Sequence, residues 1–344
     1  MKKIHFIGIG GVGMNALAQL AINNDYKVTG SDRSYNKNDS PYKELEKNGV
    51  KIYPQNGKSI NSTIDFIIYS TAIEKNNPDL EKARELNIDT LHRIDFLKIL
   101  IPDDAEIIAI TGTAGKTTTT GLLAWIFESA GLNPTVYNGA SLINWKKEDS
   151  LGNIRVGNNK LWILEADESD RSLLKLNPTH TLLTNIGNDH LSEKILIETF
   201  NKFKNQTKEI FQKGILNQFN NFNINHNLIG KHNKDNALYA LSFSYRYGID
   251  IKTTLKAIKS FKGIERRLEF IGYTKNKIKI YDDYAHNSMK IDATLNALSD
   301  KNHNYGTHAF WRPHGHSSFN NSFLELIDVF SRFLDNKKNS LSLL

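Results

Sequence analysis

The 344-residue sequence contains no cysteine, so a disulfide framework, a thiolate zinc site and a cysteine nucleophile are all excluded. It also lacks any apolar run approaching the roughly 18–20 residues of a membrane-spanning helix. Lys2 and Lys3 precede an apolar stretch that imitates a signal peptide, but four glycines interrupt that stretch. We therefore expect a cytoplasmic protein with no membrane insertion.

Basic blocks are absent as well. The 44 Lys and Arg against 37 Asp and Glu give a formal charge of +7, but the surplus is spread evenly along the chain. A nucleic-acid-binding protein usually gathers its basic residues into one stripe or tract. The composition therefore predicts a protein that does not bind nucleic acid.

Strands alternate with helices along the chain, which predicts an α/β fold with parallel sheets. The length allows two or three domains, and the patterns favour three: residues 1–102, 103–264 and 265–344. The expected strands are 3–9, 26–30, 65–69, 106–111, 160–165, 180–184, 277–282 and 307–311. The expected helices are 12–23, 78–86, 116–130, 288–298 and 319–333, and the tail 336–344 is expected to be frayed.

A glycine-rich loop follows the first predicted strand and precedes a helix. Its sequence, GIGGVG at 8–13, fits the G-x-G-x-x-G pattern that lets backbone amides approach a diphosphate at a helix N-terminus. Asp32 ends the next strand, where such folds hold a ribose hydroxyl. A nicotinamide cofactor, another nucleotide diphosphate and a purely structural turn all remain open at this point.

A second loop, TGTAGKTT at 111–118, also joins a strand to a helix. Ile110 occupies the first glycine position of the strict phosphate-loop pattern. The loop nevertheless has a nest of amides, a lysine for the β- and γ-phosphates and a threonine hydroxyl for Mg²⁺. It predicts nucleoside triphosphate binding and argues against a nicotinamide-dependent dehydrogenase.

Polar clusters end two further strands of the second domain. EADESD at 165–170 places four carboxylates in six residues, and TNIGNDH at 184–190 supplies an imidazole. The carboxyl ends of parallel strands meet at one edge of a sheet, so these groups are expected beside the phosphate loop. Together they predict one Mg–ATP site, with ordinary surface acidity as the alternative.

These motifs, in this order, resemble the Mur ligase family of ATP-dependent amide-bond-forming enzymes in peptidoglycan precursor synthesis. The resemblance extends over residues 1 to about 330. It rests on IHFIGIGGVGM (4–14), YSTAI (69–73), TGTAGKTTTT (111–120), EADESD (165–170), TNIGNDHLS (184–192), IGKHNKDNALYAL (229–241), GIERRLEF (263–270), YDDYAHN (281–287) and FWRPHG (310–315).

The resemblance implies three domains: a Rossmann-like domain that binds a UDP-sugar, a central phosphate-loop ATPase-type domain and a C-terminal α/β domain. It implies that ATP phosphorylates a carboxylate and that the amine of an amino acid then attacks the acyl phosphate. The IGIGGVGM form of the first loop favours UDP-N-acetylmuramate and L-alanine as substrates, with ATP and Mg²⁺. A ligase for a peptide or another amino acid, and a catalytically silent nucleotide-binding homologue, remain alternatives.

The resemblance also implies roles for individual residues. Lys116, His190, Arg266 and His286 would be catalytic, and Arg266 and Arg267 would occupy the hinge before the third domain. The metal would be held by Thr117, Glu165 and His190. The UDP-sugar would contact Gly10, Gly11, Val12, Gly13, Asp32 and Ser70. ATP would contact Gly112, Thr113, Gly115, Lys116, Thr117, Thr118, Asn233, Asn236 and Asp283.

The chain departs from the family pattern in length. Only 41 residues separate His190 from His232, and 32 follow Arg312. The resemblance therefore implies a shortened central domain and a third domain cut to roughly half. Ala114 and the sequence His286-Asn287-Ser288 also differ from the residues most common at those places, and no residue aligns securely with the carbamylated lysine of some members.

Overall fold

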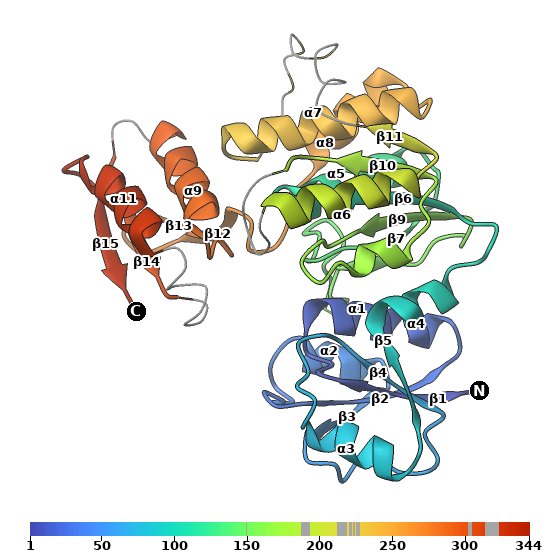
Figure 1. Cartoon of the computed structure of the whole chain (residues 1–344). Helices are drawn as coiled ribbons and strands as arrows, with labels where there is room; N and C mark the ends of the chain where they lie inside the picture. Colours follow the sequence, from blue (N-terminus) through green and yellow to red (C-terminus); the bar gives the residue numbers. More distant parts are fainter. Residues whose placement is uncertain are drawn as a thin grey trace.

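The computed structural model describes residues 1–148, 150–186, 193–211, 219, 222, 224, 228–301, 305–313 and 323–344. Within them the chain forms three α/β parts in series: an N-terminal part at the bottom of Figure 1, a central part above it and a C-terminal part beside the central one. The expected fold class is confirmed. The boundaries given above for the three domains stay predictions.

The N-terminal part is a five-stranded parallel sheet in the order β3-β2-β1-β4-β5. Its first strand is almost wholly buried, and the glycine loop follows that strand directly. Because β2 and β4 flank β1, their carboxyl ends lie on either side of the glycine loop. The elements are β1 (Lys3–Ile7), α1 (Val12–Asn23), β2 (Lys27–Asp32), α2 (Tyr42–Lys47), β3 (Lys51–Pro54), β4 (Phe66–Tyr69), α3 (Pro78–Glu85), β5 (Asp89–His92) and α4 (Arg93–Leu100).

The central part is a six-stranded sheet in the order β11-β10-β6-β9-β7-β8, parallel except for β8. Strand β6 lies between β9 and β10, so the phosphate loop, the acidic motif and Thr184 meet at one edge, as predicted. The elements are β6 (Glu106–Thr111), α5 (Lys116–Ser129), β7 (Thr135–Tyr137), β8 (Ile154–Arg155), β9 (Leu161–Glu165), the 3₁₀ helix η1 (Ser172–Lys175), β10 (His180–Leu183), α6 (Glu193–Asn205), β11 (Glu209–Phe211), α7 (Lys231–Arg246) and α8 (Ile251–Ser260).

The two faces of the central sheet are covered by different cores. Side chains of a strand alternate between faces. Leu161 and Ile163 of β9 therefore pack with α5, α7 and α8, whereas Trp162 and Leu164 join a core that also contains α1 and α4. Residues of the N-terminal and central parts thus share one continuous hydrophobic core.

Polar contacts reinforce this junction. The buried Asn153, next to β8, donates to Oδ1 of Asn15 at 2.7 Å and accepts from Nε2 of Gln19 at 3.1 Å. Gly13 lies against the same junction, because a Cβ there would be 2.7 Å from the Tyr137 hydroxyl and 3.0 Å from Nη1 of Arg93. A side chain at residue 13 would therefore push the two parts away from each other.

Gly13→Ala is expected to destabilise the protein by about 1–3 kcal/mol, because the added methyl group overpacks a buried junction. Gly11→Ala in the same loop is the matched control: its added Cβ would meet only ordinary contacts, the nearest at 3.4 Å. We expect the control to lose at most about 1 kcal/mol. Urea-induced unfolding measures both. Equal losses would contradict the role assigned to Gly13.

The C-terminal part contains two small sheets and a small core. β12 (Glu269–Tyr273) and β13 (Lys279–Asp282) are antiparallel, and β14 (His308–Trp311) pairs in parallel with β15 (Ser340–Leu343). Helices α9 (Ser288–Lys301) and α11 (Phe323–Leu334) pack on each other through five buried side chains: Ile291, Leu295, Leu326, Val329 and Phe333.

The expectation that residues 336–344 are frayed is wrong. Ser340–Leu343 form β15, in register with β14 from His308 opposite Ser340 to Trp311 opposite Leu343. The Asn339 side chain accepts from the Thr307 amide at 3.0 Å, which fixes the start of the pairing. The partner strand is far away in sequence, so no local pattern reveals the pairing.

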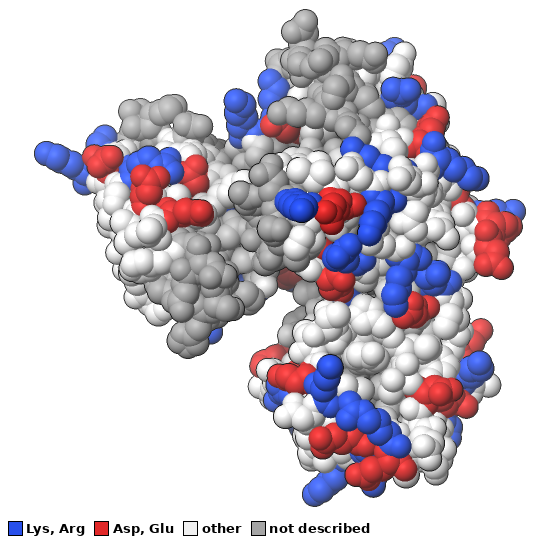
Figure 2. All heavy atoms as spheres, in the orientation of Figure 1, with Lys and Arg blue, Asp and Glu red and all other residues white. Residues whose placement is uncertain are grey.

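None of the described helices is both long and apolar enough to cross a membrane. On the face drawn in Figure 2, Lys and Arg side chains lie interspersed with Asp and Glu over the parts that the structure describes. The even charge distribution indicated by the sequence is therefore visible on this face.

Candidate functional site

The phosphate loop has the backbone that its glycines permit. Gly112 and Gly115 have φ angles of +130° and +82°, which disfavour any residue with a Cβ. Both also lie against other elements: a Cβ would collide with Thr184 at Gly112 and with Asn236 at Gly115. Helix α5 begins at Lys116 without a side-chain cap, so its first amides face the loop. The loop is thus shaped for an anion.

The end of β10 holds this loop in place. Asn185 accepts from the Ala114 amide at 2.9 Å, donates to the Ala114 carbonyl at 2.9 Å and accepts from the Thr113 amide through its own carbonyl at 3.1 Å. The Thr184 hydroxyl also donates to the Ala114 carbonyl at 2.7 Å. Asn185 was not among the predicted site residues, although its place after a strand adjacent to the loop strand was the available signal.

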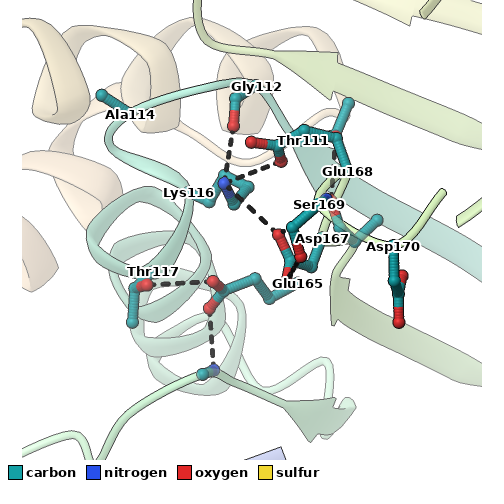
Figure 3. A network of polar contacts seen from close by, with 12 residues as sticks. Thr111, Gly112, Ala114, Lys116, Thr117, Glu165, Asp167, Glu168, Ser169 and Asp170 are labelled. Atoms are coloured by element: carbon teal, nitrogen blue, oxygen red, sulfur yellow. Dashed lines mark hydrogen bonds and ion pairs between the residues drawn. The ribbon is translucent and has the colours of Figure 1, made fainter. Parts of the chain in front are cut away.

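The acidic motif does not form a single cluster of repelling charges (Figure 3). Glu165 accepts from the Thr117 hydroxyl at 3.0 Å and from the Gly139 amide at 2.7 Å. Glu168 lies 2.8 Å from Nζ of Lys116, and Asp170 points away from that lysine toward Arg93, at 3.1 Å. Each of these carboxylates therefore has a partner outside the acidic motif, on α5 for Glu165 and Glu168 and on α4 for Asp170.

Lys116 is largely buried and charged. Its ammonium donates to the Gly112 carbonyl at 2.8 Å and pairs with Glu168, with Asp167 3.8 Å away. Burial lowers the pKa of Lys116, but Glu168, followed by Asp167 and Glu165, raises it to above its usual value. The charged Lys116 ammonium thus lies beside the phosphate loop, next to the place expected for the β- and γ-phosphates.

Thr117 and Glu165 provide hard oxygen donors side by side, the ligand type that Mg²⁺ prefers. Mg²⁺ usually takes only one or two protein ligands and completes its shell with water and phosphate oxygens, so these two residues fit the ion. His190, the third predicted ligand, lies outside the described residues. Within the described residues no group of three or more His, Asp or Glu could hold a metal.

A cavity of about 450 Å³ opens over the loop and is closed on its other side by the C-terminal part. Its lining brings together nearly all of the residues predicted to contact ATP. They are Thr113, Gly115, Lys116, Thr117, Thr118, Asn233, Asn236 and Asp283. The lining also includes Glu165, predicted as a metal ligand, and His286, predicted to be catalytic. Gly112 contributes its carbonyl to Lys116 instead.

Asn233 and Asn236 lie on α7, next to the loop. Asn236 donates to the Asn233 side chain at 3.1 Å and accepts from the Thr119 hydroxyl at 3.2 Å. Both side chains are almost fully buried. They therefore present a fixed amide surface to the cavity.

The two arginines of the hinge point in different directions. Arg267 lines the cavity, and its Nη2 donates to the Thr117 hydroxyl at 3.5 Å. Arg266, the one predicted to be catalytic, is not among the described residues that line it: its Nε lies 3.6 Å from Asp282, and its guanidinium lies over the Tyr284 ring. The structure thus brings Arg267, not Arg266, to the phosphate loop.

Asp283 is tied to the hinge. It accepts from the amides of Leu268 at 2.7 Å and Ala285 at 2.8 Å, and Leu268 has a φ of +46°, unusual for a bulky residue. Burial raises the pKa of Asp283, although these amides act in the opposite direction. His286 lies three residues further along the chain, and its Nδ1 atom is 3.0 Å from the Tyr284 carbonyl oxygen.

The glycine loop of the N-terminal part forms the second candidate site. Gly11 precedes helix α1, which begins with Val12 and Gly13 and has no acidic residue in its first turn. Asp32 accepts from the Gly10 amide at 2.8 Å, so the predicted acidic residue lies directly against the loop. Ser70 follows β4, the neighbour of β1 on the other side. All six predicted residues therefore belong to one edge of the sheet.

Comparison with known proteins agrees with this arrangement. The profile described as Mur ligase family, catalytic domain, matches residues 3–105, and the Mur ligase middle domain matches residues 110–219. The fold resembles the UDP-N-acetylmuramate–alanine ligase MurC of Thermotoga maritima (TM-score 0.82, 22% identity, covering 100% of this chain and 90% of that one). It also resembles a murein peptide ligase of Psychrobacter arcticus (TM-score 0.74, 22% identity, covering 100% and 91%).

Curated relatives are more similar in sequence. The UDP-N-acetylmuramate–L-alanine ligase of Dictyoglomus turgidum is 35% identical over 86% of this chain and 73% of its own length. The ligase of the same name from Aquifex aeolicus is 32% identical over 96% of this chain and 81% of its own length. The expected shortness relative to the family is confirmed. Identity at this level over most of both chains, together with the two loops and the cavity between the parts, shows that this chain belongs to the Mur ligase family.

Proposed function

We propose that this protein is an ATP-dependent ligase that joins L-alanine to the carboxylate of UDP-N-acetylmuramate, with Mg²⁺, in peptidoglycan precursor synthesis. The observation that carries the proposal is the phosphate loop with the charged Lys116 at its mouth and Thr117 and Glu165 beside it. The identity of the substrates is supported by the names of the curated relatives. Because ATP and nucleotide-linked sugars are cytoplasmic substrates, the proposal includes a cytoplasmic location.

The reaction has two steps. A carboxylate oxygen of the sugar attacks the γ-phosphorus of ATP, ADP leaves, and an acyl phosphate forms. The amine of L-alanine then attacks the acyl carbon, loses a proton and expels inorganic phosphate to leave the amide. Both steps move negative charge through a site already rich in anions, so positioning and cationic stabilisation supply most of the catalysis.

The residues of this chain divide that work. The glycine loop of Gly10–Gly13 offers the N-terminus of α1 to the UDP diphosphate. Lys116, Arg267 and the phosphate loop line the same cavity. Lys116 and Arg267 would therefore contact the γ-phosphate, and the amides of the phosphate loop would bind the β-phosphate. Mg²⁺, held by Thr117 and Glu165, would neutralise phosphate charge there. Lys116 would exchange its contact with Glu168 for phosphate oxygens when ATP binds.

Competition between acceptors tests the proposal. The protein is incubated with UDP-N-acetylmuramate, ATP, Mg²⁺ and an equimolar mixture of L-alanine, glycine, L-serine and a tripeptide, and the products are identified by mass spectrometry. We expect the L-alanyl product to predominate. A predominant tripeptide product would instead assign the chain to the peptide-adding ligases, and no ligated product despite ATP binding would indicate a catalytically silent homologue.

A further inference from the structure

The acidic segment Glu165–Asp170 contacts the phosphate-loop site at one end and helix α4 of the N-terminal part at the other. At its start, Glu165 accepts from Thr117 of the phosphate loop helix, and Glu168 pairs with Lys116. At its end, Asp170 pairs with Arg93, the first residue of α4 in the N-terminal part. Six residues of one segment therefore join the ATP loop to the N-terminal part of the molecule.

The Arg93–Asp170 pair is partly buried and makes further polar contacts. The Asp170 side chain is only 9% exposed, and it also accepts from the Ser172 amide at 2.9 Å. His92, next to Arg93, lies 4.0 Å from the same carboxylate. Burial raises the pKa of Asp170, but the contacts with Ser172 and Arg93 outweigh that effect and lower it overall, so the carboxylate is charged.

The other side of Arg93 meets the glycine loop. Its Nη1 lies 3.0 Å from the position that a Cβ of Gly13 would occupy, and the Tyr137 hydroxyl donates to the Gly13 carbonyl at 3.2 Å. Gly13 lies in the first turn of α1, the turn that would receive the diphosphate. A shift of Arg93 would therefore displace a part of the loop that binds the nucleotide-sugar.

We infer that the Arg93–Asp170 pair is a positioning device that couples nucleotide-sugar binding at the glycine loop to ATP binding at the phosphate loop. The inference rests on the proposed function. Lys116 has two alternative partners, Glu168 in the structure described and phosphate when ATP is bound, and a change of partner releases the buried Glu168. The Asp170 end of the segment then moves, Arg93 shifts with it, and the glycine loop is displaced in turn.

Such coupling is reciprocal: if the sugar nucleotide tightens ATP binding, ATP tightens sugar-nucleotide binding by the same factor. The dissociation constant of a non-hydrolysable ATP analogue with Mg²⁺ is measured by calorimetry without and with saturating UDP-N-acetylmuramate. We expect the two constants to differ by about fivefold or more in the unmodified protein. In Arg93→Gln and Asp170→Asn, the ratio should fall to within about twofold of one.

Asp95→Asn is the matched control. Asp95 also lies on α4 and pairs with Lys175 of η1 at 2.6 Å, but that pair is exposed and away from both loops. It should keep the full coupling. Arg93→Lys retains the charge without the forked geometry and should restore part of the coupling, which keeps the test valid if Arg93→Gln folds poorly.

The outcomes separate the inference from the proposed function. If the unmodified protein binds the ATP analogue but not UDP-N-acetylmuramate, the proposed function fails. If both ligands bind and the coupling is absent, or survives unchanged in Arg93→Gln and Asp170→Asn, the inference is overturned. The inference is supported if the coupling is lost while the dissociation constant of each ligand alone changes little. A purely structural defect would instead weaken the binding of each ligand on its own.

Discussion

Lys116→Ala is expected to lower ATP-dependent phosphate release by about 10³-fold or more. The Lys116 ammonium is the buried cation at the mouth of the phosphate loop, held by the Gly112 carbonyl and Glu168. Without it, the negative charge that moves between ATP and the acyl phosphate loses its nearest compensating group. Glu168 would also be left buried beside the incoming phosphates, which adds repulsion.

Lys256→Ala on α8 is the control, because this lysine is exposed and far from the loop in sequence. It should leave the rate unchanged. Phosphate release is measured at saturating UDP-N-acetylmuramate, ATP and L-alanine, and ATP-analogue binding is measured in parallel. Lys116→Ala turning over within tenfold of the unmodified protein would refute the assignment of this loop as the ATP site.

Glu165→Gln is expected to lower the rate by about 10²-fold at low Mg²⁺ and to raise the Mg²⁺ concentration for half-maximal rate by about tenfold. Glutamine keeps the shape. Its oxygen can still accept from the Gly139 amide while its NH₂ group donates to the Thr117 hydroxyl, so the local structure should survive. The change removes the negative charge that attracts the ion. Added Mg²⁺ should therefore recover much of the lost rate.

The control for this variant is Glu106→Gln. Glu106 begins β6, at the opposite end of the strand from the phosphate loop, where it accepts from the Tyr247 hydroxyl. Its substitution should leave the Mg²⁺ dependence as it is. A rate deficit in Glu165→Gln that high Mg²⁺ leaves untouched would contradict the assignment of Glu165 as a ligand.

The two loops could be predicted from sequence because each is a local pattern: a buried strand, glycines and a helix. The order of strands then follows from how parallel sheets are built, so Glu165 was correctly expected beside the phosphate loop. Residues 336–344 show the opposite case. Their strand depends on pairing with β14, some thirty residues earlier, and their short polar alternation carries no signal of its own.

Site residues that act through tertiary contacts were harder to predict. Asn185 holds the phosphate loop only because β10 lies beside β6, and Asp170 acts through Arg93, 77 residues away in sequence. Arg266 and Arg267 are adjacent and chemically identical, so the sequence could not say which one faces the cavity. The backbone decides this, with Arg266 at a φ of +56°.

The C-terminal part of this chain is small, yet it places Asp283, His286 and Arg267 around the phosphate loop. Whether a C-terminal part of this size supports turnover is the central question about this ligase. The direct measurement is the rate of phosphate release by the full chain with ATP, Mg²⁺ and UDP-N-acetylmuramate, with and without L-alanine. Release that depends on L-alanine is the predicted result. Release at the same rate without L-alanine, or no release from protein that binds ATP, would contradict the account.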